Sequence, residues 1–188
     1  MDVLPIFARA TARPCLVVGG GAVAAGKAAV LLKAGAHVTV VAPQLDEVLA
    51  EHHTNGAINW IDGEYVPSQL DGKWLVIAAT NDAVLNAQIV KLAETKGILV
   101  NAASDGSIGS FIMPAIIDRS PVIAAVSTGG ASPVLARILR ARLESLIPPA
   151  FGQLAALSKD FRAEVKRRFS RSSERRAFWD RMFSGPVA

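Results

Sequence analysis

Short apolar runs alternate with helix-forming stretches through about the first hundred residues, and this alternation constrains the fold more than any other feature. One run, 74–79 (WLVIAA), is apolar throughout, which is typical of a parallel strand covered on both faces. The rhythm predicts a doubly wound parallel sheet with right-handed crossovers, that is, a Rossmann-type α/β fold. Strands are expected at 15–18, 37–41, 58–61, 74–79 and 98–100, and helices at 23–32, 44–53 and 83–96.

The rhythm changes after residue 100. Further strands are expected at 110–113 and 122–127, with 116–121 joining them. Ser132-Pro133 should begin a helix, because proline suits the first helical turn, and Pro148-Pro149 should end it. Two or three amphipathic helices are expected in the remainder.

Composition limits the class of protein. Of the 188 residues, 51% are hydrophobic and 19% are charged, which excludes wholesale disorder and allows a substantial core. No apolar stretch approaches the roughly 20 residues that cross a bilayer, and the N-terminus lacks the pattern of a secretory signal. The single cysteine, Cys15, falls in an expected buried strand. These features predict a protein of the reduced cytoplasm that does not bind membranes.

The net charge of +4 belongs to the C-terminal tail. Residues 160–188 contain eight basic and four acidic side chains, so the rest of the chain is neutral in sum. A basic tail suits an acidic partner, either an anionic substrate or nucleic acid. An NAD-sensing regulator whose tail binds DNA is therefore one alternative. Against it, the tail has no clear helix-turn-helix and its aromatic residues resemble a core, so no nucleic-acid partner is expected.

Residues 19–24 (GGGAVA) satisfy the dinucleotide pattern G-x-G-x-x-G/A between a strand and a helix. Gly19 makes the tight turn, Gly21 allows backbone to approach a pyrophosphate, and Ala24 allows close packing of helix and strand. The helix N-terminus supplies N–H donors and positive dipole. Ala22 and Val23 open that helix and complete the expected cofactor-binding stretch.

The second strand ends without the acidic residue that usually holds the ribose hydroxyls. Its end reads Ala42-Pro43-Gln44, so backbone groups at Pro43 and Gln44 are expected to hold the adenosine. No arginine stands there for a 2′-phosphate, which favours NAD over NADP. At the end of the fourth strand, Ala79 and Thr80 are expected to line the nicotinamide side, and Thr80 or Asp82 is expected to cap the next helix.

The chain resembles one family over nearly its whole length. The resemblance rests on several longer stretches, among them LVVGGGAVAAGKAAVLLKAGAHVTVVAP, SFIMPAIIDRSP, STGGASPVLARILRARLES and RRAFWDRMF. The family is the precorrin-2 dehydrogenase and sirohydrochlorin ferrochelatase module at the N-terminus of bacterial siroheme synthases. The resemblance implies an NAD-binding Rossmann domain over 1–112, a dimerisation segment over 113–147 and a basic helical domain over 148–188.

The resemblance also implies an activity. NAD accepts a hydride from precorrin-2 to give sirohydrochlorin, and Fe²⁺, a substrate, is then inserted in the same cleft to give siroheme. The family is a homodimer, and in many bacteria a methyltransferase domain that makes precorrin-2 is fused to it. Here the chain ends at Ala188, so an excised fragment is expected, with a separate methyltransferase as the other possibility. A dehydrogenase without chelatase activity is a further alternative.

Precorrin-2 carries many carboxylates, and arginines such as Arg119 and Arg137 are expected to meet them. Ser127, Thr128 and Gly129 precede a helix N-terminus and form a second possible anion site. The simpler interpretations are a solvated helix face for the arginines and an ordinary turn with a helix cap for the second group.

The family carries a general-base aspartate shortly after the fifth strand, and this chain departs from it. Counting back from SFIMP, Ser104 occupies that position and Asp105 follows it. Both proposed reactions remove protons, from carbon during oxidation and from pyrrole nitrogens during chelation. Asp105, with Gly106 beside it, is therefore the expected catalytic base, although an aspartate before glycine is also a common turn. A serine hydroxyl is a poor base without an activating partner.

Metal ligands are scarce. The three histidines are His37, His52 and His53, and the last two fall on an expected surface helix. No metal site made by the protein is expected.

Overall fold

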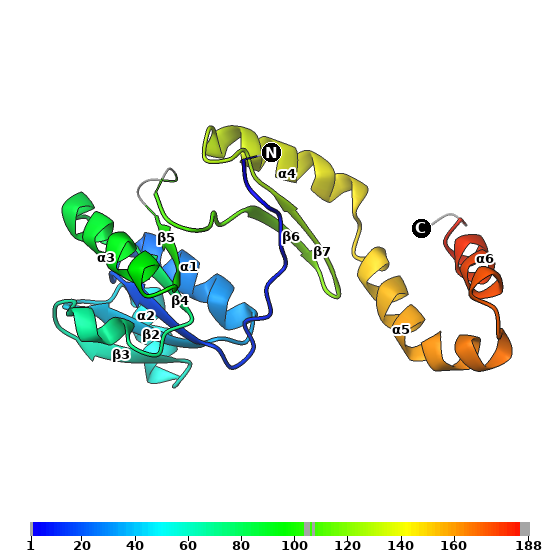
Figure 1. The fold of residues 1–188 in the computed structure, drawn as a ribbon, viewed down its shortest axis with the longest axis horizontal. Coiled ribbons are helices and arrows are strands. Elements are labelled where there is room, and N and C mark those ends of the chain that lie inside the picture. The colour runs from blue at the N-terminus through cyan, green and yellow to red at the C-terminus, as the bar shows by residue number, and fades with distance from the viewer. Residues whose placement is uncertain (1, 104–105, 107, 185–188) are drawn as a thin grey trace. The chain divides into compact units, whose positions relative to one another are not determined.

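The computed structural model describes residues 2–103, 106 and 108–184 (Figure 1). The chain divides into two compact units. The first comprises residues 1–113 together with 129–131, and the second comprises residues 114–128 together with 132–188.

The first unit is built on a five-stranded parallel sheet in the order β3-β2-β1-β4-β5. This order confirms the doubly wound Rossmann-type fold, with the first strand in the middle. The strands are β1 (Pro14–Val18), β2 (His37–Ala42), β3 (Ile58–Asp62), β4 (Leu75–Ala78) and β5 (Leu99–Ala102).

Helices cover both faces of this sheet. Helices α1 (Ala22–Lys33) and α2 (Glu47–Thr54) pack on one face, and α3 (Ala83–Thr95) and the 3₁₀ turn η1 (Pro67–Leu70) pack on the other. In β1, Cys15 and Val17 face the first pair while Leu16 and Val18 face the second. All four are at most 2% exposed. The apolar strands of the sequence are therefore apolar because both of their faces are buried.

Side-chain caps set two of the helix starts. The Oδ1 atom of Asp46 accepts a hydrogen bond from Leu49 N at 2.9 Å, so α2 begins at Glu47, three residues later than the apolar pattern suggested. Asp82 Oδ1 accepts from Val84 N at 2.8 Å and from Leu85 N at 3.0 Å at the start of α3. The prediction that this loop caps the following helix is thus confirmed.

The strand predicted at 110–113 is wrong. Ser110 N and Phe111 N both donate to Val100 O, at 2.8 and 3.3 Å, and a single antiparallel bridge joins Asn101 and Gly109. The segment is strapped to the edge of β5 without extending into a strand of its own. The next strand, β6 (Ala115–Arg119), lies largely where a connection was expected.

In the second unit, β6 pairs antiparallel with β7 (Val122–Val126). Asp118 Oδ1 closes the turn between them by accepting from Ser120 N at 2.9 Å and from the Ser120 hydroxyl at 2.6 Å. Helices α4 (Pro133–Leu146), α5 (Ala150–Arg168) and α6 (Ser172–Phe183) follow. Helix α4 begins at Pro133, as the Ser-Pro pair predicted, and the Ser132 hydroxyl caps it by accepting from Leu135 N at 3.2 Å.

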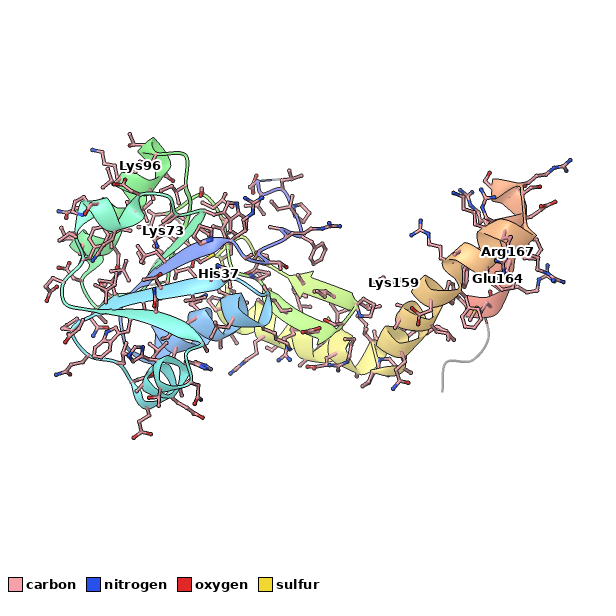
Figure 2. The ribbon with its side chains drawn as sticks, turned by 90° about the horizontal axis from the view of Figure 1, so that it is seen from below. His37, Lys73, Lys96, Lys159, Glu164 and Arg167 are labelled. Carbon is pink, nitrogen blue, oxygen red and sulfur yellow. The ribbon has the colours of Figure 1, made fainter. Side chains whose placement is uncertain are left out.

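Arg119 holds the hairpin of the second unit to its first helix. The guanidinium donates to Ile147 O at 3.0 Å and to Glu144 at 3.2 Å, and Glu144 also pairs with Arg140 at 2.9 Å. Helix α5 has two buried residues, Gly152 and Val165. Figure 2 shows Lys159, Glu164 and Arg167 along it, and the last two form an ion pair within one helical turn.

Cys15 lies fully buried in the central strand. Burial raises the pKa of its thiol to about 11, and the charge of Lys73 offsets only part of that effect. A thiol with such a pKa is overwhelmingly protonated near neutral pH and is a poor nucleophile. No helix among the residues described is long and apolar enough to cross a membrane.

Gly152 at the start of α5 allows a close contact with the β6–β7 turn. A Cβ atom there would overlap the carbonyl oxygen of Arg119, which is backbone and cannot move aside easily. We expect Gly152→Ala to lower the free energy of unfolding by about 1–3 kcal/mol, measured by denaturant titration. Gly26→Ala in α1 is the matched control, because nothing lies within 4 Å of its added carbon. It should raise stability by about 0.5–1 kcal/mol. Equal effects at both positions would contradict the packing assignment.

Candidate functional site

The chain turns from β1 into α1 at Gly19. Its φ of 125° lies in a region that other residues rarely adopt, and its N–H donates to Val41 O at 2.9 Å. A Cβ atom here would overlap the carbonyl oxygen of Ala79, just after β4. Gly19 is therefore held between the carboxyl ends of β2 and β4, as expected of the first glycine of a dinucleotide turn.

Gly20 makes an equally close contact with the segment after β2. An added Cβ atom would overlap Gln44 O, and Gly20 O accepts from Asp46 N at 2.8 Å. Pro43 and Gln44 are exposed beside this contact. The predicted adenosine-side residues thus lie at the rim next to the glycine turn.

Gly21 is glycine for a different reason. Its φ of −87° is open to any residue, yet no atom lies within 4 Å of where its Cβ would be. It stands at the N-cap of α1, whose first turn has no side-chain cap and no acidic residue. Open space in front of uncapped N–H donors suits a pyrophosphate. The residues present therefore fit a dinucleotide.

The first turn of α1 supports this cradle. Val23 is 57% exposed, and Ala24 is fully buried against the sheet. The alanine in the third motif position therefore does what the pattern requires, by letting helix and strand pack closely. Lys27 follows on the next turn, and burial lowers the pKa of its amine.

The loop after β4 is held by a buried asparagine that sequence reasoning missed. Asn86 on α3 is fully buried. Its Oδ1 accepts from Thr80 N at 3.2 Å and from the Thr80 hydroxyl at 2.7 Å, while its Nδ2 donates to Thr80 O at 3.0 Å. These bonds fix Ala79 and Thr80 at the sheet edge. One feature of the sequence could have revealed it, namely a lone asparagine among the apolar residues of an expected helix.

Ser110 and Phe111, which follow the segment with the predicted base, bond to the edge of β5. Val100 N donates to the Ser110 hydroxyl at 2.8 Å, and Asn101 Nδ2 donates to Phe111 O at 3.0 Å. Ser104 and Asp105 themselves lie outside the described residues. Their predicted catalytic roles remain predictions.

The predicted substrate-binding residues fall mostly in the second unit. Arg119 is engaged in the bonds that hold the hairpin to α4, whereas Arg137 is exposed on α4. Thr128 Oγ1 bonds with the backbone N and O of Ser132, both at 3.1 Å, so it shapes the turn before α4. Ser127 and Gly129 flank it. Substrate binding by this set stays a prediction.

No group of three or more His, Cys, Asp or Glu side chains that would hold a metal occurs in the part of the chain that the structure describes. Of the predicted non-ligand histidines, His53 stacks edge-on against Trp60 with ring centroids 5.5 Å apart.

Three family models match successive parts of the chain. Residues 6–115 match a family described as "Putative NAD(P)-binding". Residues 125–146 match the central region of sirohaem biosynthesis proteins, and residues 150–188 match the sirohaem synthase dimerisation region. The chain belongs to the siroheme synthase family.

Individual proteins similar to this chain are also siroheme synthases. Siroheme synthase 3 of Aeromonas hydrophila is 52% identical over 182 residues, covering 97% of this chain and 39% of the relative. The siroheme synthase of Methylobacillus flagellatus is 49% identical over 187 residues, covering 100% of this chain and 40% of the relative. The chain thus spans about two fifths of the length of these curated relatives.

One solved structure is also similar. The precorrin-2 dehydrogenase SirC superposes with a TM-score of 0.79 at 28% identity, over 93% of this chain and 86% of that protein. Both the Rossmann-type unit and the helical region that follows it therefore have a counterpart in a known enzyme.

Substitutions at Gly20 and Gly21 distinguish a glycine needed for packing from a glycine needed for ligand binding. Gly21→Val should fill the open space without a steric clash, lowering the unfolding free energy by no more than about 1 kcal/mol because valine is a poorer N-cap residue than glycine. It should weaken binding of a nicotinamide dinucleotide at least about tenfold, because the pyrophosphate loses its approach to backbone. Calorimetric titration and thermal melts measure both effects.

Gly20→Ala is the control, since its Cβ would overlap Gln44 O and should lower stability directly. If Gly21→Val binds the dinucleotide as the parent does, the cradle is not the pyrophosphate site.

Proposed function

We propose that this chain oxidises precorrin-2 to sirohydrochlorin with NAD, and then inserts Fe²⁺ to give siroheme. The observation that carries the proposal is the likeness to a precorrin-2 dehydrogenase over 86% of that protein, joined to an intact dinucleotide cradle at Gly19–Gly21. Membership of the siroheme synthase family supports the same pathway step.

The chain's part in oxidation is to hold the cofactor and orient it across the sheet edge. When bound, NAD supplies the hydride acceptor. The first turn of α1 would take the pyrophosphate, and Pro43 and Gln44 would lie against the adenosine. No acidic side chain and no arginine stand at the end of β2, where the sequence runs Ala42-Pro43-Gln44. The absence of arginine is why we propose NAD and not NADP.

Asp105 is the proposed general base, with Ser104 beside it in the family's aspartate position. Both reactions release protons, and a carboxylate near the sheet edge would take them. The described residues on either side of this segment are bonded to the sheet. Ala103 N donates to Ala78 O at 2.8 Å, and Ser110 and Phe111 bond back to Val100.

Iron in this scheme is a substrate. The tetrapyrrole nitrogens and a carboxylate would carry it, with no metal cluster supplied by the described side chains. A dehydrogenase without chelatase activity remains the second candidate, and the serine at position 104 favours it because that position lacks the family's carboxylate.

A homodimer is part of the proposal. Helix α4 has no buried residue, and its exposed apolar side chains include Val134, Leu135, Ile138 and Leu146. The segment that follows α4, residues 150–188, matches a dimerisation region, which supports contact with a second copy. The buried single thiol agrees with a cytoplasmic location, which we also propose.

The oxidation is tested by following NADH formation with precorrin-2. We expect turnover by the parent chain, and a loss of about a hundredfold or more in Asp105→Ala. Ser104→Ala is the comparison variant and should cost far less activity than Asp105→Ala, because a serine hydroxyl without an activating partner is a poor base. Parent-like turnover by Asp105→Ala would show that the base lies elsewhere, and no turnover by the folded parent would overturn the proposed oxidation.

Chelation is tested separately by adding Fe²⁺ and sirohydrochlorin and recording the siroheme spectrum. Ser104→Asp places a carboxylate in the family position, so we expect it to raise the chelation rate while oxidation changes little. An unreactive parent together with an active Ser104→Asp would establish the dehydrogenase-only alternative.

A further inference from the structure

Asn101 on β5 carries a buried acceptor without a partner. It is 5% exposed, and the other buried polar side chain among the described residues is Asn86. The amide of Asn86 is satisfied by Thr80, whereas Asn101 Oδ1 has no hydrogen-bond partner. An unsatisfied buried acceptor costs free energy that an apolar residue of similar size would avoid. The oxygen of this amide, unlike its nitrogen, therefore calls for a functional reason.

The orientation of the Asn101 amide is settled by its neighbour. The Nδ2 atom donates to Phe111 O at 3.0 Å, and a backbone carbonyl accepts but cannot donate. The nitrogen must therefore face Phe111, so the free group is an acceptor oxygen. A ligand that satisfies it must bring an N–H or O–H donor.

The position of Asn101 relates it to the cofactor cradle. Val100 and Ala102 face α3, so Asn101, between them, faces the side of the sheet on which α1 packs. Asn101 lies in register with Ile77 of β4, which lies in register with Val17 of β1. It is therefore on the same face as the helix whose N-terminus forms the open cradle.

The sheet order indicates which half of a bound dinucleotide would lie near β5, the strand that carries Asn101. The cradle lies at β1, with Pro43 and Gln44 on the β2 side of it, and β4 and β5 lie on the opposite side. A dinucleotide whose pyrophosphate lies at Gly21 and whose adenosine lies towards β2 directs its nicotinamide towards β4 and β5. The polar handle of that ring is a primary carboxamide, whose –NH₂ group donates hydrogen bonds.

We infer that Asn101 Oδ1 accepts a hydrogen bond from the carboxamide –NH₂ group of the nicotinamide ring. This inference rests on the proposed use of a nicotinamide cofactor and names the residue that recognises the reactive half. The bond satisfies the orphaned acceptor on binding and fixes which way the ring faces. Asn101 is thus a cofactor-orienting residue whose role is independent of the proposed base.

The test compares three ligands by calorimetric titration of the full chain: NAD⁺, its 3-acetylpyridine analogue and ADP-ribose. The analogue replaces –NH₂ by –CH₃, and ADP-ribose lacks the ring. For the parent we expect NAD⁺ to bind about tenfold more tightly than the analogue, since one buried hydrogen bond is lost. Asn101→Leu should weaken NAD⁺ about tenfold, remove its advantage over the analogue, and leave ADP-ribose unchanged.

Ser110→Ala is the matched control. It removes the bond between Val100 N and the Ser110 hydroxyl, so it loosens the same strap without touching the acceptor. We expect a lower melting temperature with the tenfold discrimination intact. Equal loss of discrimination in Ser110→Ala and Asn101→Leu would assign the effect to the strap and overturn the inference.

The parent's own preference keeps the test independent of whether a variant folds. A parent that binds NAD⁺ and the analogue equally overturns the role of Asn101 while the proposed function stands. A parent that binds neither dinucleotide overturns both.

Discussion

The close approach of backbone to backbone at Gly19 and Gly20 is the contact on which the rest of the first unit depends. These residues lie against the carbonyls of Ala79 and Gln44, where no side chain fits. The contact brings the ends of β1, β2 and β4 together and aims the N-terminus of α1 at their common edge. Gly21 is not needed for this packing, so the open space beside it is available to the proposed cofactor. The packing constraint and the proposed binding role thus fall on adjacent residues of one tripeptide.

The alternation of apolar runs was enough to predict the doubly wound sheet, because each buried strand must be apolar on both faces. It failed at 110–113 and 115–119 for a local reason. SFIM is apolar because Phe111 packs on the core, but its backbone bonds only to the edge of β5. The polar end of β6 resembled a turn because Asp118 closes one, two residues further on. Hydrophobic pattern reports burial, and burial does not require a strand.

The geometry of the glycine turn was predictable because a known motif describes it, whereas contacts across a loop have no such motif. No sequence pattern indicates that Asn86 bonds to Thr80, six residues earlier, or that Phe111 orients the amide of Asn101, ten residues earlier. Both are polar residues inside apolar elements, a pattern that flags a buried amide but not its partner. The two amides differ in one respect that only structure reveals: one is satisfied by the protein and the other is not.

The thiol of Cys15 in the central strand can report local unfolding of the sheet. Cys15 is the chain's single cysteine, it is fully buried, and its neighbours on both sides are sheet. A reagent that modifies thiolates can reach it only when β1 separates from its neighbours. When reclosing is faster than modification, the observed rate divided by that of an unfolded peptide gives the equilibrium for exposing the middle of the sheet. The rate of modification of the Cys15 sulfur therefore measures the local stability of the central strand without an added label.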